Sequence, residues 1–327
     1  MLGAGSWGTA LAMQAARSGR QVALWGRNAG QVCEMAESRA NMAYLPGYAF
    51  APSLQPEPDL GKAVCGASLV MLSVPSHAFA DTLAMAAPLL DDGARVCWAS
   101  KGFEPGTGRL LHQVAQELLP GPSAGAILTG PSFAQEVAAD LPTAVTVASA
   151  DDELAQAIVD VFHHGSFRAY RSNDIVGAEL GGAMKNVMAI GTGISDGMNL
   201  GTNARAAIIT RGLAEMMRLS DALGGRRETL TGLSGVGDLV LTCTGDLSRN
   251  RRYGLARGQG MSHEDALEDI QQVVEGVGTA RSLLALAAGV NVELPISEQI
   301  HRIVEGEITA AEGVRNLLAR VPRVETD

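Results

Sequence analysis

Three glycines at fixed spacing near the start of the chain constrain its fold more than any other feature. They occur in Gly3-Ala4-Gly5-Ser6-Trp7-Gly8, and residues 9–17 that follow have the pattern of a helix. This GxGxxG spacing allows a tight turn from a strand into a helix and brings backbone amides close to a bound pyrophosphate. Residues 21–25 supply a second strand at the expected distance, whereas only Met1 and Leu2 precede the turn. The pattern predicts a dinucleotide-binding unit with a shortened first strand.

Short apolar runs alternate with helix-like segments over the first half of the chain. The expected strands lie at residues 21–25, 68–74, 94–99, 125–129, 143–148 and 166–170, and a helix is expected at 151–162. Such alternation favours an α/β fold with a Rossmann-type, mostly parallel sheet. From Asn173 onward the pattern changes to long helical stretches, including residues 204–223 and 263–274. We predict a dinucleotide-binding Rossmann domain over residues 1–170 and a helical substrate and catalytic domain over residues 171–327.

An arginine stands where the second predicted strand ends, in Gly26-Arg27-Asn28. Proteins that bind NAD commonly use Asp or Glu at this place to bind the ribose hydroxyls, whereas an arginine can bind a 2′-phosphate. Arg27 therefore favours NADP(H), with NAD(H) as the second cofactor. The alternative is a solvated surface arginine with no ligand.

A single lysine, Lys185, interrupts the otherwise uncharged segment of residues 180–195. A helix that is apolar or small-sided nearly all round is typically buried, and lysine is rarely buried without a partner or a chemical role. Desolvation would lower the pKa of Lys185 toward the range of a general base. The alternative is a lysine that extends from the helix edge to solvent.

Two loops follow predicted strand ends, the side on which ligands bind in open α/β sheets. They are residues 73–77 and residues 100–103, and the second makes Lys101 a candidate cation for the substrate, although a loop lysine is ordinarily just solvated. A third loop, residues 129–134, contains a Gly-Pro step that favours an extended or turn geometry. We expect backbone contacts to a ligand there.

The second half of the chain contains two further candidate segments. Residues 234–239 place Asp238 in a flexible glycine-rich stretch, and residues 248–252 concentrate arginines in an acidic chain. Such cations could bind a phosphate, with an arginine fork and Asn250 as donors. The alternative, a solvated helix face, applies to Arg251 and Arg252 more than to the whole group.

Charge and cysteine usage exclude several classes of protein. A net charge of −10 argues against general affinity for nucleic acid. The four cysteines, Cys33, Cys65, Cys97 and Cys243, show no metal-ligand spacing, and reduced thiols indicate an intracellular compartment. No signal peptide is visible and no apolar run suggests membrane insertion, so we expect a cytoplasmic protein without a metal.

Taken together, these motifs resemble the bacterial NAD(P)-dependent glycerol-3-phosphate dehydrogenases over nearly the full length of the chain. The matching segments are GAGSWGTALA, WGRN, SVPSHAF, ASKGFEPGTGRLL, TGPSFAQEVAADLPTA, GAELGGAMKNVMAIGTGISDGMNLGTNARAAIITRGLAEM, SGVGDLVLTCTGDLSRNRRYG and QVVEGV. The resemblance implies a second domain of the 6-phosphogluconate dehydrogenase C-terminal type. It also implies reversible hydride transfer between NAD(P)H and dihydroxyacetone phosphate, which gives sn-glycerol 3-phosphate for glycerophospholipid synthesis.

The same resemblance assigns roles to individual residues. Lys185 becomes the general acid/base at the carbon-2 oxygen, with Asn186 as its orienting partner. The implied cofactor contacts are Gly3, Gly5, Ser6, Trp7, Gly8, Arg27, Lys101, Ala134, Arg249, Val273 and Glu275. The implied substrate contacts are Lys101, Gly130, Ser132, Lys185, Asp238, Ser248, Arg249 and Asn250.

Two other functions fit part of the pattern. A dehydrogenase of the 6-phosphogluconate or hydroxyisobutyrate type shares the nucleotide domain and a helix-borne lysine, but residues 234–239 and 248–254 favour the first family. A catalytically silent NADP-binding sensor would explain Arg27 but leaves Lys185, Lys101 and Arg249 without a common purpose. The sequence leaves open the cofactor preference ratio, feedback inhibition, whether the short start is native, and the oligomeric state, for which a homodimer is one option.

Overall fold

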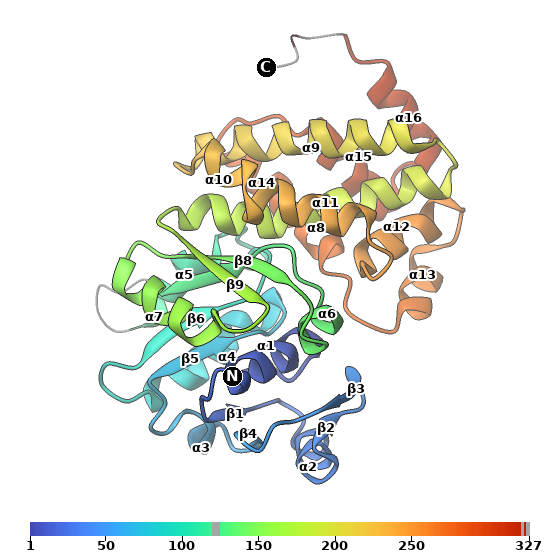
Figure 1. The fold of residues 1–327 in the computed structure, drawn as a ribbon. Helices are drawn as coiled ribbons and strands as arrows, with labels where there is room; N and C mark the ends of the chain where they lie inside the picture. The colour runs from blue at the N-terminus through green and yellow to red at the C-terminus, as the bar shows by residue number, and fades with distance from the viewer. Residues whose placement is uncertain (120–124, 322–323, 325–327) are drawn as a thin grey trace. The chain divides into compact units, whose positions relative to one another are not determined.

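The computed structural model describes residues 1–119, 125–321 and 324. The chain forms two compact units (Figure 1): the first consists of Met1–Lys101 and Leu111–Ile175, and the second of Gly102–Leu110 and Val176–Asp327. The short segment Gly102–Leu110 therefore leaves the first unit and belongs to the second before the chain returns.

The first unit is built on a five-stranded sheet in the order β5-β6-β7-β8-β9. Its strands are β5 (Leu69–Leu72), β6 (Arg95–Trp98), β7 (Ala126–Thr129), β8 (Thr143–Ala148) and β9 (Phe167–Ser172). All neighbouring pairs are parallel except β7 and β8, which are antiparallel. The sheet is thus mostly parallel, as the alternating pattern predicts.

Leu2 takes the place of a central strand. Leu2, which is fully buried, forms parallel bridges to both Trp25 and Leu72. Its amide donates to Met71 O at 2.7 Å, and its carbonyl accepts from Ser73 N at 2.7 Å. Leu2 therefore joins the five-stranded sheet to a parallel pair formed by β1 (Val22–Leu24) and β4 (Leu54–Pro56).

Helices and one further strand pair complete the first unit. The helices are α1 (Ser6–Arg17), α2 (Ala29–Ser38), α3 (Leu60–Val64), α4 (Phe79–Ala86), α5 (Leu111–Leu118), α6 (Ala134–Ala138) and α7 (Asp152–Phe162), with short 3₁₀ turns at Ser76–Ala78 and Ala87–Leu89. The antiparallel pair consists of β2 (Ala40–Asn41) and β3 (Leu45–Ala49). Asp151 caps α7 by accepting from Glu153 N and Leu154 N, which explains why that helix begins where the sequence predicts.

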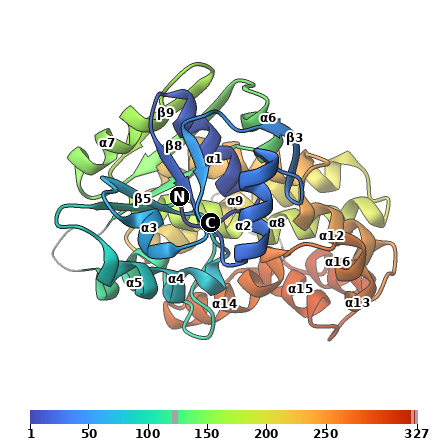
Figure 2. The same cartoon turned by 90° about the horizontal axis from the view of Figure 1, so that it is seen from below.

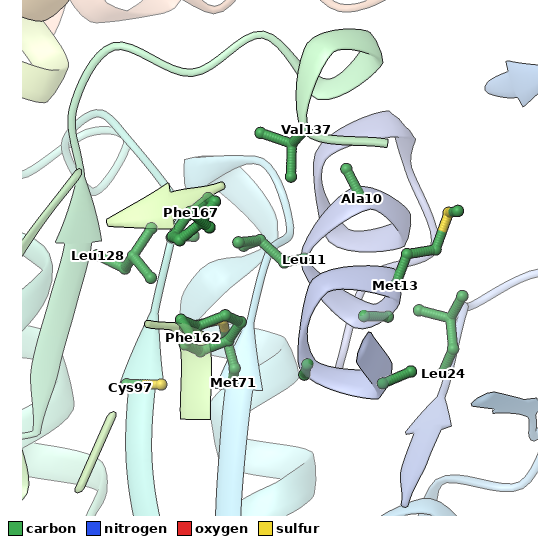
Figure 3. Packing of buried hydrophobic residues seen from close by; sticks show 14 of the residues in the cluster. Ala10, Leu11, Met13, Leu24, Met71, Cys97, Leu128, Val137, Phe162 and Phe167 are labelled. Atoms are coloured by element: carbon green, nitrogen blue, oxygen red, sulfur yellow. The ribbon is translucent and has the colours of Figure 1, made fainter. Parts of the chain in front are cut away.

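The core of the first unit holds α1 against the sheet. Figure 3 shows Leu11 of α1 extending toward Phe162 and Phe167, and all three side chains are at most 1% exposed. The two phenylalanine rings lie 6.3 Å apart between centroids. At roughly 25 cal/mol per Å² of apolar area removed from water, such side chains each contribute about 1.5–3 kcal/mol to folding. This packing fixes α1, and with it the glycine turn that precedes α1.

The described residues of the second unit from Val176 onward contain helices and no strands, as the sequence predicts. They are α8 (Ile175–Gly197), α9 (Thr202–Ala222), α10 (Arg227–Thr231), a π-helical turn (Leu233–Gly237), α11 (Asp238–Thr244), α12 (Arg249–Gly258), α13 (His263–Ile270), α14 (Glu275–Gly289), α15 (Pro295–Val304) and α16 (Ala310–Leu318). Helix α8 is buried over nearly its whole length. Within the part of the chain that the structure describes, every helix is too short or too polar to span a bilayer.

Glycines bring α12 into direct backbone contact with the C-terminal half of α8 (Figure 2). A Cβ on Gly193 would lie 2.1 Å from Arg251 O, and a Cβ on Gly254 would lie 2.1 Å from Ile190 O. Gly197 and Gly258 repeat these approaches one turn further on. Side chains at these positions would force the two helices apart, so the glycines set how closely α12 lies on α8.

Candidate active site

The glycine turn before α1 has a backbone that other residues could not adopt. Gly3 has φ of 117°, and a Cβ there would lie 2.6 Å from Ser73 O. A Cβ on Gly8 would lie 1.9 Å from Gly3 O. By contrast, a Cβ on Gly5 would meet no described atom within 4 Å, and Gly5 is the N-cap of α1 with no side-chain hydrogen bond to the helix. The turn therefore leaves room beside the amides at the start of α1, which is the environment a pyrophosphate requires.

Two side chains beside the turn, Ser6 and Trp7, have polar atoms that a dinucleotide could contact. The Nε1 atom of Trp7 is buried and has no hydrogen-bond partner among the described residues. A buried N–H donor without a partner is costly, so a ligand acceptor at this position would satisfy it. The hydroxyl of Ser6 donates to Tyr44 O at 2.7 Å and can still accept a hydrogen bond. Both residues fit the cofactor that the sequence predicts.

Asn41, which the sequence analysis did not single out, holds the glycine turn by hydrogen bonds. The side chain of Asn41 is fully buried, and its amide donates to Ala4 O at 2.9 Å and to Thr9 Oγ1 at 2.8 Å. Asn41 lies on β2, in a strand pair that carries no recognisable motif. Its role depends on a tertiary contact, so no local sequence signal could have revealed it.

Arg27 lies three residues after the end of β1 and is exposed. A Cβ on the preceding residue, Gly26, would lie 2.9 Å from the Cβ of Ala4, so the strand end packs closely on the glycine turn. The next residue, Asn28, caps α2 by accepting from Gln31 N at 3.2 Å. Arg27 is thus placed beside the turn with its charge in solvent, a position that suits contact with a ribose phosphate.

Three predicted substrate residues of the first unit converge on one carbonyl. Lys101 Nζ donates to Gly130 O at 3.5 Å, and Ser132 Oγ donates to the same oxygen at 2.9 Å. Gly130 has φ of 139°, and a Cβ there would lie 3.0 Å from Val145 Cα. The glycine is therefore needed for the turn after β7 to lie against β8. Ala134, a predicted cofactor contact, begins α6 just after this turn.

In the second unit, Lys185 of α8 forms an ion pair with Asp238, the first residue of α11. Lys185 is 8% exposed and Asp238 is fully buried. The alternative in which Lys185 extends to solvent is therefore wrong. A buried ammonium needs a counter-charge, and Asp238 supplies it at close range.

Asp238 is positioned by a helical turn and not by the flexible stretch that the sequence analysis expected. Residues 233–237 form a π-helical turn that continues into α11. A Cβ on Gly181 of α8 would lie 2.0 Å from Ser234 O, so this turn packs directly on α8. Thr242 Oγ1 also donates to Asp238 O at 2.6 Å. The glycines here permit close packing, which is why the expectation of flexibility is wrong.

A thiol on the same helix stays uncharged beside this ion pair. Burial raises the pKa of Cys243 to about 12, while a hydrogen bond with Thr192 and the charge of Lys185 oppose the rise. Cys243 is therefore a neutral thiol at all physiological pH values. It adds no third charge next to Lys185 and Asp238.

Asn186, next to the lysine, takes part in a buried amide network. Asn250 Nδ2 donates to Asn186 Oδ1 at 2.9 Å, and Gly276 N donates to Asn250 Oδ1 at 2.9 Å. Asn186 Nδ2 also lies 3.4 Å from Glu275 Oε2. The network links α8, α12 and the start of α14. It holds Asn186 in a fixed orientation beside Lys185.

The start of α12 presents one arginine outward and another inward. Ser248 caps the helix by accepting from Arg251 N at 3.2 Å. Arg249 is exposed and donates to Gln272 Oε1 at 3.2 Å, close in sequence to the exposed Val273. The alternative of a solvated helix face is wrong for Arg251, because its side chain is only 12% exposed and pairs with Asp196.

Each unit thus gathers its own part of the predicted site. In the first unit, Lys101, Gly130 and Ser132 lie together, and Ser6, Trp7 and Arg27 lie at the glycine turn. In the second unit, Lys185 pairs with Asp238, and the adjacent Asn186 contacts Asn250 and Glu275. Sequence analysis did not single out Thr242, although its spacing of four residues from Asp238 on a helix offered a signal.

Two family models match the two parts of the chain. A model of the NAD-dependent glycerol-3-phosphate dehydrogenase N-terminus matches residues 1–155, and one of the corresponding C-terminus matches residues 174–315. This chain belongs to that family. Its members are oxidoreductases, so the expectation of an enzyme is confirmed. The chain is therefore not a dehydrogenase of the 6-phosphogluconate or hydroxyisobutyrate type.

Individual relatives agree with this assignment. Glycerol-3-phosphate dehydrogenase (NAD(P)+) of Xanthomonas campestris pv. campestris strain B100 is 54% identical over 326 residues, which cover 99% of this chain and 95% of that protein. The protein of the same name from Stenotrophomonas maltophilia strain R551-3 is 53% identical over 325 residues, with the same coverage of 99% and 95%. The crystal structure of glycerol-3-phosphate dehydrogenase from Coxiella burnetii superimposes with a TM-score of 0.94 at 45% identity and covers 98% of each chain. The predicted fold class is therefore confirmed.

Proposed function

We propose that this protein catalyses reversible hydride transfer between NAD(P)H and dihydroxyacetone phosphate, giving sn-glycerol 3-phosphate. The observation that carries this proposal is the buried ion pair of Lys185 and Asp238. The dinucleotide turn and membership of the glycerol-3-phosphate dehydrogenase family support it. A buried lysine paired with a carboxylate is suited to proton transfer and to stabilising a developing negative charge.

Lys185 would act at the carbon-2 oxygen of the substrate. Reduction of a ketone places negative charge on this oxygen, and the ammonium of Lys185 would stabilise that charge and then donate its proton. In the oxidation direction the neutral amine would take the proton back. Asp238 would hold the ammonium in place between these steps, and the Asn186–Asn250 contact would keep the adjacent part of α8 fixed.

The first unit would bind most of the cofactor, which supplies or accepts the hydride when bound. The amides at the glycine turn would contact its pyrophosphate, and Arg27 would favour NADPH over NADH through the 2′-phosphate. We assign the following residues to the cofactor: Gly3, Gly5, Ser6, Trp7, Gly8, Arg27, Lys101, Ala134, Arg249, Val273 and Glu275.

The substrate would be held by cations and by hydrogen-bond donors. Arg249 offers a planar fork suited to a phosphate, and its exposed position at the start of α12 supports this role. We assign Lys101, Gly130, Ser132, Lys185, Asp238, Ser248, Arg249 and Asn250 to the substrate. We further propose that the product serves glycerophospholipid synthesis. We also propose that the protein is cytoplasmic, since all four cysteines are free thiols, as a reducing compartment requires.

The test is NADPH oxidation by the purified protein with dihydroxyacetone phosphate, compared with other ketones. We expect turnover with dihydroxyacetone phosphate and far less with unphosphorylated dihydroxyacetone or with 2-keto acids. Tight NADPH binding without turnover on any of these ketones would instead support a catalytically silent sensor. Turnover on a different ketone with none on dihydroxyacetone phosphate would show that the substrate assignment is wrong.

A further inference from the structure

An ion-pair cluster lies where the end of α8 meets α9 and α12. Asp196 accepts from Arg251 Nε at 3.1 Å and from Arg251 Nη2 at 2.8 Å, and it also accepts from Arg205 Nε at 3.0 Å. Arg251 Nη1 donates to Asp246 at 2.8 Å. The side chains of Asp196 and Arg251 are only 9% and 12% exposed. None of these residues has a role in the proposed chemistry.

The position of Asp196 is unfavourable unless arginines accompany it. Asp196 lies in the last turn of α8, where the helix dipole is negative and disfavours a carboxylate. Its near-complete burial adds a desolvation cost. Two donors of the planar Arg251 guanidinium, Nε and Nη2, reach Asp196 Oδ2, while Arg205 Nε reaches Oδ1, and these charge-assisted hydrogen bonds offset both effects.

Arg251 also contacts α8 through its backbone. Its carbonyl packs against Gly193, where an added Cβ would lie only 2.1 Å away, and its amide donates to the capping hydroxyl of Ser248. The side chain then reaches Asp196, three residues beyond Gly193. A single residue thus fixes both the register of α12 on α8 and the first turn of α12.

Arg249 and Arg251, two of the three arginines near the start of α12, point in different directions. Residues two apart on a helix are separated by roughly 200° around its axis. This separation explains why Arg249 is exposed while Arg251 turns toward Asp196. Asp196 and Asp246 already pair with the charge of Arg251. Arg251 therefore contributes to the site by placing α12.

We infer that the Arg251–Asp196 pair is a positioning device that sets α12 on α8, so that Arg249 and Asn250 are held in a fixed relation to Lys185. The inference rests on the proposed function, in which Arg249 binds the phosphate of the substrate. Loss of the pair would let the start of α12 shift, and even a displacement of about 1 Å can reduce catalysis by roughly 100-fold. The effect should be greatest for substrates that carry the phosphate.

The test compares kcat/KM for dihydroxyacetone phosphate with kcat/KM for unphosphorylated dihydroxyacetone, in variants of both members of the pair. We expect Arg251→Ala and Asp196→Asn each to lower this ratio by about 10- to 100-fold. Arg251→Lys should lower it less, because lysine keeps the charge but lacks the fork. Arg252→Ala removes the same charge from an exposed neighbour on α12 and should leave the ratio unchanged.

The outcomes separate the alternatives. If Arg251 bound phosphate directly, Arg251→Ala would lower the ratio and Asp196→Asn would not, which would overturn the inference. An unchanged ratio in folded variants with a lower melting temperature would also overturn it, because the pair would then serve stability alone. Asp196→Asn is nearly isosteric, and its melting curve shows whether it is folded. Absence of wild-type turnover on dihydroxyacetone phosphate would refute the proposed function first, and the inference with it.

Discussion

The carboxylate of Asp238 is completely buried, and its ion-pair partner is Lys185, which lies 53 residues earlier in the chain and is also buried. The two charges therefore stabilise each other away from solvent, in a setting where neither could remain ionised alone without a large cost. The close packing of Ser234 on Gly181 fixes the helical turn that carries Asp238. The geometry of the pair thus depends on backbone contact between two segments.

Removal of the Asp238 charge should destabilise the protein. Asp238→Asn leaves Lys185 buried without a counter-charge, which typically costs about 3–5 kcal/mol. Urea unfolding of wild type, Asp238→Asn, Lys185→Met and the double variant would measure this cost. We expect the double variant to be more stable than Asp238→Asn alone, because no unpaired charge remains. Additive losses in the four proteins would contradict a coupled pair.

Replacement of Arg27 should affect NADPH more than NADH. Arg27→Ala would remove the proposed charged contact to the 2′-phosphate, which NADH lacks, so NADPH binding should weaken on the order of 1–3 kcal/mol while NADH binding changes little. Titration of both cofactors by fluorescence would measure the two dissociation constants. Arg20→Ala, which removes an exposed arginine of the same unit, serves as the control. Equal losses for both cofactors would rule out a 2′-phosphate contact.

Arg249 should matter for the phosphate of the substrate. Arg249→Ala is expected to lower kcat/KM for dihydroxyacetone phosphate far more than for dihydroxyacetone, because only the first carries the group that the guanidinium binds. Steady-state kinetics with both substrates would check this. A uniform loss for the two substrates would point instead to a role toward the cofactor or the fold.

Glu215 should make stability depend on pH. Its buried carboxylate accepts from Ser297 N at 3.1 Å and Ser297 Oγ at 2.7 Å at the start of α15. Burial raises the pKa of Glu215 above its ordinary value of 4.5, against these hydrogen bonds and the charge of Arg218. Because the folded state then holds its proton more tightly than the unfolded state, stability is greatest below that ordinary value and falls as pH rises through the folded pKa.

Glu215→Gln should flatten this part of the pH profile of the free energy of unfolding. Glu312→Gln is the matched control, since hydrogen bonds from Thr309 lower the pKa of Glu312, and its contribution is lost as pH falls. Urea unfolding at several pH values would measure both profiles. If Glu215→Gln left the pH profile of the free energy of unfolding unchanged, the pKa of Glu215 in the folded protein would not be raised above its ordinary value.

The elements that sequence patterns predicted well are those set by local chemistry. The expected helix at residues 151–162 is observed as α7, because an aspartate cap marks its start. The strand expected at residues 143–148 is observed as β8 with the same bounds, since its apolar residues are buried in the sheet. The glycine turn was recognisable because Gly3 and Gly8 have backbone approaches that only glycine allows.

The features that sequence patterns missed depend on partners far away in the chain. The transfer of Gly102–Leu110 to the second unit and the antiparallel pairing of β7 with β8 arise from tertiary contacts. Arg251 looked like part of a solvated face because its partner, Asp196, lies 55 residues away. Burial of Lys185 was predictable from its uncharged surroundings, but its pairing with Asp238 was not.

The final prediction concerns Lys185, the residue to which we assign proton transfer. Lys185→Arg keeps a positive charge for Asp238, so the protein should fold and bind NADPH, but arginine does not readily release its proton. We expect turnover to fall by roughly 10²- to 10⁴-fold, measured as NADPH oxidation with saturating dihydroxyacetone phosphate. Lys185→Ala should be similarly inactive and less stable. Wild-type turnover by the arginine variant would mean that a fixed charge suffices, and wild-type turnover by the alanine variant would remove Lys185 from the mechanism.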